Sequence, residues 1–306
     1  MTAPVEVVDP TLAERPLRAS SGRLSGLARR LDERLIAPGS SQRLALVRSG
    51  LAIVVALRVG TRNWALLAHQ PPALFDPVGV AHVFPHMPGA WFFWAVRAIG
   101  VVAAVLVVAR KAPTVAFPVA WLCLLVLAGL WSSAGKILHN DVLLLLTCVP
   151  MLFAPADQGY GDRSESPRWG WPPRAGLAMV GLVYFLTGYQ KLHHSGPAWV
   201  TGDNMRWVLY QGALDKSPFP SLARDLAGQP WLTHVMAGTA IGIELAAPLL
   251  LFLRPTRRVF LLLVAGMHTM IWVTLGLDYW GWILTVAAVT LPAATVVLRT
   301  SPPDVT

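Results

Sequence analysis

The lysine at position 191 is the side chain in this sequence best placed for acid–base chemistry. Tyr184, Gly188 and Lys191 recur at helical spacing, so they share one face of a predicted helix. One interpretation is purely structural: a lysine at the end of an apolar helix places its methylene stem among lipid tails and its ammonium group at the membrane surface. A lysine that faces an enclosed apolar site differs, because desolvation favours its uncharged form, which can act as a base. The residues leave both interpretations open.

Histidines supply the second set of candidates. His139 precedes Asn140 and Asp141 at the start of an apolar segment, where the three residues could cap a helix or take part in chemistry. His268 lies about halfway along another apolar segment. Five others show no recognised metal-ligand spacing, so we predict no metal site: His82, His86, His193, His194 and His234.

Charged residues inside apolar segments form the third set. Glu244 lies near the middle of one such segment, and a charge at the bilayer centre costs on the order of 3 kcal/mol. Such a charge normally has a partner, and the expected partners are Arg97, Arg48 and Arg58, which also lie within apolar segments. A structural ion pair is one interpretation of these residues, and a substrate or proton pathway is the other.

The composition indicates what kind of protein carries these residues. Of its 306 residues, 55% are hydrophobic and 13% are charged. The apolar residues come in blocks of about 20, the length that crosses about 30 Å of hydrocarbon as a helix. We therefore predict an all-α integral membrane protein, a polytopic bundle of about eight transmembrane helices. Their expected ranges are 44–61, 91–109, 115–133, 138–154, 175–192, 234–253, 258–276 and 280–298.

Basic residues predict the orientation of this bundle. With the N-terminus inside, sixteen of the 25 lysine and arginine residues fall in inner segments and five in outer ones. Because cytoplasmic loops are enriched in positive charge, we predict a multi-pass protein of the cell membrane with both termini cytoplasmic and residues 193–233 outside. The net charge of +9 arises mainly in short loops beside apolar segments, so we expect a lipid bilayer as partner and no nucleic acid.

The chain divides into three predicted parts. Residues 1–42 form a basic cytoplasmic segment, residues 43–299 the transmembrane domain, and residues 300–306 a short cytoplasmic tail. Within the first part, four leucines at helical spacing predict an amphipathic helix on the inner leaflet: Leu24, Leu27, Leu31 and Leu35.

The segment around the lysine also resembles a known signature. The run Tyr184-Phe-Leu-Thr-Gly-Tyr-Gln-Lys191-Leu, followed by Trp199-Val-Thr-Gly202, is similar to Tyr-x3-Gly-x2-Lys-Leu…Trp-x2-Gly. That pattern belongs to the vitamin K-dependent gamma-carboxylase-like family, also called the horizontally transferred transmembrane domain. The resemblance extends over approximately residues 42–295. Weaker similar stretches follow the expected order: Pro72–Pro77, His139-Asn140, Phe153–Asp157, Glu244 with Pro248, and His268.

The resemblance implies a reaction and a set of roles. In that family, a lysine matching Lys191 is the base that deprotonates a reduced quinone, and a histidine matching His139 supports it. The implied cofactors are vitamin K hydroquinone or menaquinol together with oxygen, and the quinone leaves as its epoxide. Carbon dioxide is a further co-substrate if a glutamate of a secreted peptide or protein is carboxylated. We expect Tyr184, His268 and Trp199 to bind the quinone.

One departure from the family keeps other functions open. The carboxylase has a large lumenal region after its helices, which binds its substrate, and the last predicted helix here is followed by a few residues only. The leading hypothesis is a membrane enzyme that uses a reduced quinone and oxygen at its outer face. The alternatives are a maturation or immunity factor that acts on a secreted peptide with a partner, and a small-molecule transporter.

Overall fold

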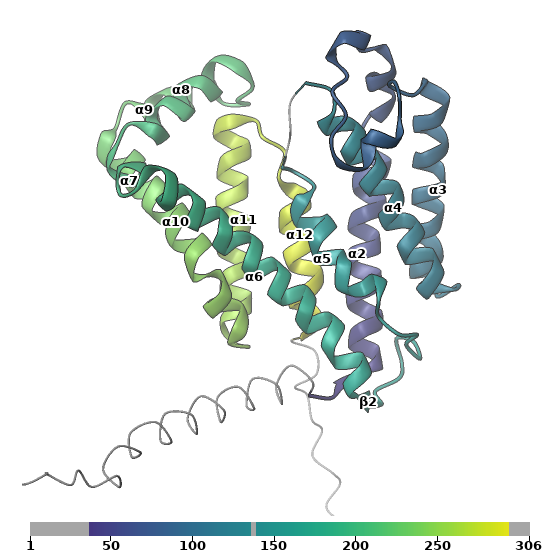
Figure 1. Cartoon of the computed structure of the whole chain (residues 1–306). Helices are drawn as coiled ribbons and strands as arrows, with labels where there is room; N and C mark the ends of the chain where they lie inside the picture. Colours follow the sequence, from purple (N-terminus) through teal and green to yellow (C-terminus); the bar gives the residue numbers. More distant parts are fainter. Residues whose placement is uncertain (1–36, 136–138, 294–306) are drawn as a thin grey trace, which may run out of the picture.

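The computed structural model describes residues 37–135 and 139–293, and most of them are helical (Figure 1). The predicted amphipathic helix around residues 24–35 and the predicted tail at 300–306 lie outside the described residues. Within the described residues, five helices have the length and apolar composition needed to cross a membrane. They are α2 (Ser41–Thr61), α3 (Ala90–Val108), α4 (Pro113–Ser132), α10 (Pro230–Phe252) and α11 (Thr256–Leu275).

The outward faces of these five helices are apolar. Leu262 of α11 is 71% exposed and Val115 of α4 is 65% exposed, whereas soluble monomers rarely expose large contiguous apolar patches. Such faces suit contact with the hydrocarbon of a bilayer. The predicted all-α fold is confirmed for the described residues, and these five helices have the length and the apolar composition of membrane spans.

Three further apolar segments form helices of other lengths. α6 (Pro167–Ser195) has 29 residues, whereas α5 (Val142–Leu152) and α12 (Trp280–Thr290) have 11 each. Eleven residues span only about 16 Å as a helix, about half of the hydrocarbon core. The segments predicted at 138–154 and 280–298 therefore correspond to short helices, and the count of eight spans stays a prediction.

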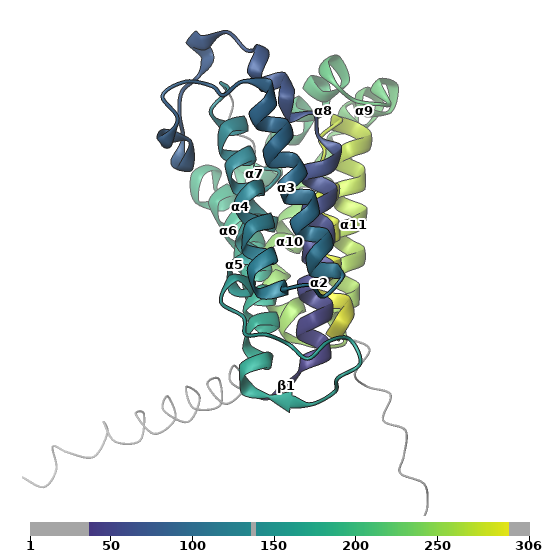
Figure 2. The same cartoon turned by 90° about the vertical axis from the view of Figure 1, so that its right-hand side faces the viewer.

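The two ends of the bundle differ. At one end, which we call the lower end, β1 (Gly39–Ser40) pairs antiparallel with β2 (Glu165–Ser166). The opposite, upper end carries several short helices (Figures 1 and 2). These are η2 (Trp64–His69), η3 (Pro72–Leu74), η4 (Gly79–Val83), α7 (Ala198–Thr201), α8 (Asn204–Asp215) and α9 (Pro220–Ala227), and η5 (Leu291–Ala293) follows α12.

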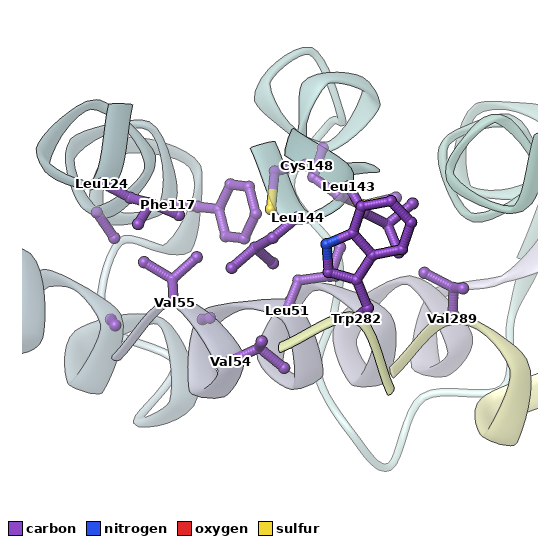
Figure 3. Close-up of a cluster of buried hydrophobic side chains, with 14 of the residues drawn as sticks. Leu51, Val54, Val55, Phe117, Leu124, Leu143, Leu144, Cys148, Trp282 and Val289 are labelled. Carbon is purple, nitrogen blue, oxygen red and sulfur yellow. The ribbon is translucent and has the colours of Figure 1, made fainter. Parts of the chain in front are cut away.

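The helices pack around a core in which α2 is central. α2 contacts α3, α4 and α12, while α6 contacts α10 and α5. Figure 3 shows part of this core, where apolar side chains from four helices meet. The labelled members include Leu51 and Val55 of α2, Phe117 and Leu124 of α4, Leu143 and Cys148 of α5, and Trp282 and Val289 of α12.

Buried ion pairs fix both ends of α2. Near the lower end, the fully buried Arg48 donates to Asp157 at 2.8 Å and to the carbonyl of Pro155 at 2.8 Å. At the upper end, Arg58 pairs with Asp141, which opens α5, and with Asp278, which precedes α12, at 2.6 Å. Because each pair joins segments far apart in sequence, both are structural contacts of the fold.

Candidate functional site

The candidate site forms where α6 crosses α10 near the upper end. Gly188 makes the close approach possible, because a Cβ atom at that position would lie 2.9 Å from the Cβ of Glu244. The ammonium Nζ of Lys191 lies 2.5 Å from Oε1 of Glu244. The side chain of Glu244 is 6% exposed and that of Lys191 is 24% exposed. Solvent or a ligand therefore reaches the ion pair from the side of Lys191.

The prediction that Glu244 pairs with an arginine was wrong. Arg48 and Arg58 are bound by aspartates at the two ends of α2, and Arg97 donates to the carbonyl of Gly60. The physical reason is the packing order, because α10 lies against α6 and not against the helices that carry the arginines. The lysine of α6 is the cation that this packing brings to Glu244.

An indole ring covers the lysine. Nζ of Lys191 lies 5.5 Å from the ring centroid of Trp199, which belongs to α7. A cation at this distance from an indole face is attracted by the ring quadrupole. The side chain of Lys191 thus turns toward Glu244 and Trp199, in contrast to a lysine that extends freely to the membrane surface.

A second polar pair lies deeper in the bundle, on the same face of α6. The hydroxyl of Tyr184 lies 2.9 Å from Nε2 of His268 on α11, and both residues are buried. The imidazole stacks on the ring of Tyr279, with centroids 5.1 Å apart. Trp282 packs against Tyr184 and His268 with centroid distances of 5.3 and 5.5 Å. Burial raises the pKa of the Tyr279 hydroxyl, so this group stays neutral.

The two pairs interact electrostatically and keep free polar atoms. The charge of Lys191 acts on His268, and the charge of Glu244 acts on Tyr184. Among the described residues, three buried atoms here have no hydrogen-bond partner: Oε2 of Glu244, Nδ1 of His268 and Nε1 of Trp199. Buried polar atoms are normally paired, and an unpaired one calls for an explanation. Together they offer an acceptor, a donor and a group that can be either.

The contacts of His139 differ from those of the residues around Lys191. Its side chain is exposed, and its carbonyl accepts from the amide of Val142 at 3.2 Å. In the described part of the chain, no hydrogen bond joins His139 to Lys191. The neighbouring Asn140 is tied to the aromatic cluster, because its carbonyl accepts from Nε1 of Trp282 at 2.9 Å. The role of His139 as a support for Lys191, which the family resemblance implies, stays a prediction.

Two aromatic members of the site were not anticipated. Tyr279 and Trp282 come from the tight turn before α12 and from its first turn. The signal in the sequence was the run Tyr279-Trp-Gly-Trp282 directly after Asp278, which places three aromatic rings at one membrane boundary. Within residues 37–135 and 139–293, no three histidine, cysteine or acidic side chains gather as a metal site would require.

Comparison of the chain with protein-family models, with curated proteins and with solved structures finds no match.

Proposed function

We propose that this chain is a membrane enzyme that oxidises a reduced quinone with oxygen near its upper end, with Lys191 as the base. The observation that carries the proposal is the Lys191–Glu244 pair beside three unpaired buried polar atoms and a set of aromatic rings. The resemblance of residues 184–202 to the carboxylase-like signature supports the same chemistry.

The chemical fit of a reduced quinone to these residues is good. A hydroquinone is a flat ring with two opposed hydroxyl groups, each of which can donate and accept a hydrogen bond. Trp199 Nε1 could donate to one hydroxyl, and Glu244 Oε2 could accept from it. Tyr279 and Trp282 would supply apolar faces, since binding sites for such ligands are mostly apolar with a few polar groups. One bound reduced quinone and one O2 would yield one quinone epoxide and one water: the quinone would give up four electrons in all, two as a quinol and two as the epoxide forms, and its two hydroxyl protons would leave in the water.

The residues of the chain handle the proton. In the ion pair, Nζ of Lys191 donates to Oε1 of Glu244 at 2.5 Å. Transfer across this short contact leaves a neutral amine and a neutral carboxyl, a pair of states that low-dielectric surroundings favour. The amine can then accept a proton from an acidic hydroxyl, and Glu244 keeps the proton that the lysine released. His268 would bind the quinone ring through Nδ1, while the hydrogen bond from Tyr184 to Nε2 fixes the orientation of the imidazole.

We also propose that eight helices cross the membrane with both termini in the cytoplasm. The sixteen-to-five distribution of basic residues supports this orientation. It places the upper end, with Lys191 and His139, outside the cytoplasm. In this proposal, His139 is a positioning residue that acts through the Asn140–Trp282 contact.

The test uses the purified full-length protein with vitamin K hydroquinone and menaquinol as substrates. The readouts are oxygen consumption and epoxide formation. Lys191→Arg preserves the charge and the ion pair, but arginine is not deprotonated in proteins. We expect this variant to fold like the wild type and to lose activity by at least about a hundredfold, the size of a typical acid–base contribution.

The matched control is Lys111→Arg, an exposed lysine at the lower end, which should keep full activity. Full activity of Lys191→Arg would refute the assignment of the base. Absence of turnover by the wild type with both quinols would overturn the proposed reaction and turn attention to a maturation factor for a secreted peptide. A carbon dioxide requirement for peptide modification would extend the reaction to carboxylation.

A further inference from the structure

An open pocket lies between α3 and α4, which run side by side at the edge of the bundle (Figures 1 and 2). Its volume is about 470 Å³, which falls within the range of about 300–1,000 Å³ that small-molecule sites occupy. Nine of the ten residues that line it are apolar, and four of these nine are alanines. We call this pocket the α3–α4 groove.

The shape of the groove follows from the sizes of the side chains that line it. Ala103 and Ala116 are buried and form its floor, where their short side chains leave space between the two helices. Val102 and Val115 form its rims and are 58% and 65% exposed. Because floor and rims are both apolar, the groove suits hydrocarbon and not water when these helices cross a membrane.

Lys111 is the one polar side chain that lines the groove. It is exposed and lies in the turn between α3 and α4, at the lower end of both helices. Among residues 37–135 and 139–293, its ammonium group has no ion-pair partner. The neighbouring Arg110 pairs with Asp157. The apolar groove therefore ends in one uncompensated positive charge.

Specific contacts of the turn hold Lys111 at this place. Arg110 and Ala112, on either side of it, have φ angles of 63° and 47°, in the left-handed region that residues other than glycine rarely adopt. The amide of Lys111 donates to the carbonyl of Leu106 at 2.8 Å and so closes the end of α3. Such conformations persist only where the surroundings fix them, so the fold itself sets the position of the lysine.

We propose that the α3–α4 groove binds an anionic phospholipid, with one acyl chain in the groove and the phosphate at Lys111. An ammonium group forms charge-assisted hydrogen bonds with phosphate oxygens, and basic residues near a membrane surface attract anionic headgroups. In a phospholipid the headgroup lies at the surface and the acyl chain runs into the bilayer, which matches a charge at the lower end of the helices and an apolar groove beside them. The groove shares no residue with the Lys191–Glu244 pair, so the inference does not depend on the proposed quinol chemistry.

Charge favours a lipid over a second copy of the chain as the occupant of the groove. A helix of a second copy could also pack against small side chains, but Lys111 would then need an acidic partner. Across the five long apolar helices of the described chain, Glu244 is the one acidic residue, and Lys191 already pairs with it. A phospholipid supplies an apolar chain and a negative charge in one molecule.

The experiment measures lipid retention by the intact protein. The purified full-length chain is stripped of lipid in a neutral detergent and incubated with phosphatidylglycerol or with phosphatidylcholine that has the same acyl chains. Native mass spectrometry quantifies the bound lipid, and far-ultraviolet circular dichroism checks that each variant is folded. We expect the wild type to retain phosphatidylglycerol about five-fold more strongly, since one basic residue near an anionic surface contributes about 1 kcal/mol.

Two substitutions separate the charge from the groove. Lys111→Gln should lower the affinity for phosphatidylglycerol about five-fold, to the level of phosphatidylcholine. Ala98→Phe introduces a ring into the groove from an exposed position. It should weaken the binding of both lipids alike, by about four-fold for each methylene group that the ring displaces.

Each variant has a matched control that should retain both lipids like the wild type. Arg163→Gln removes an exposed charge at the lower end, and Val105→Phe adds a ring at an exposed position of α3 outside the groove. Equal retention of the two lipids by the wild type would overturn the proposal, as would equal effects of a variant and its control. Palmitate that binds more tightly than phosphatidylglycerol would overturn the assignment to a phospholipid. A dimer that Ala98→Phe dissociates, with lipid retention unchanged, would assign the groove to a second copy instead.

Discussion

Removal of one partner of the Lys191–Glu244 pair should have unequal effects on stability. In Lys191→Met, the carboxylate of Glu244 remains 94% covered by protein, and neither of its oxygens keeps a partner among the described residues. An uncompensated buried charge of this kind costs about 3 kcal/mol of unfolding free energy. In Glu244→Gln, the lysine is 24% exposed and still lies over the ring of Trp199. We therefore expect a loss of only about 1 kcal/mol there, the size of one hydrogen bond.

The double variant Lys191→Met/Glu244→Leu supplies the third value. With both charges absent, nothing is left to desolvate, so its stability should lie within about 1 kcal/mol of the wild type. The deviation from additivity then measures the coupling of the pair. Its activity should nevertheless be absent, because both proton-handling groups are lost.

Reversible unfolding in mixed micelles with increasing sodium dodecyl sulfate, followed by far-ultraviolet circular dichroism, gives these free energies. Lys216→Met, at an exposed position at the end of α8, is the control and should be neutral. The reasoning fails if Glu244→Gln costs as much as Lys191→Met, or if the two single effects simply add in the double variant.

Three other outcomes are expected. Gly188→Ala should destabilise the protein by about 1–3 kcal/mol through overpacking, because the new methyl would lie 2.9 Å from the Cβ of Glu244; wild-type stability in the same unfolding assay would contradict this contact. Tyr184→Phe removes one buried hydrogen bond and should cost about 1 kcal/mol while weakening quinol binding, read as a raised KM; an unchanged KM would separate this tyrosine from the site. In a background without native cysteines, Ser221→Cys should react with an impermeant thiol reagent added to whole cells and Ser164→Cys should not; the reverse labelling would invert the proposed orientation.

The sequence allowed the prediction of features that depend on local pattern. Hydropathy over windows of about 20 residues found the five long apolar helices. Helical spacing placed Tyr184 and Lys191 on one face of α6, and both indeed contact residues of the neighbouring helices α10 and α11. The mid-membrane position of Glu244 correctly indicated that it needs a cationic partner.

Local sequence patterns do not specify which helices pack together, so features that depend on helix packing could not be predicted. Three arginines within apolar segments were the expected partners of Glu244, and only the packing of α10 on α6 selects Lys191. The short lengths of α5 and α12 were also missed. α5 begins only after the polar turn at residues 139–141, and α12 ends at the 3-10 turn Leu291–Ala293, whose residues are as apolar as the helix. The aromatic cluster around His268 required Tyr279 and Trp282 to fold back beside α6.

The contacts of Arg58 have a consequence for biosynthesis. This arginine belongs to α2, the first helix of the described residues, yet its partners Asp141 and Asp278 lie 83 and 220 residues later. At translation rates of about 5–20 residues per second, the second partner emerges roughly 10–40 seconds after the arginine. During that interval the nascent α2 carries an incompletely neutralised charge at the membrane boundary. The turn before α12 therefore completes the neutralisation of this charge on α2, and nascent chains that end before Asp278 should be preferred substrates of membrane quality-control proteases.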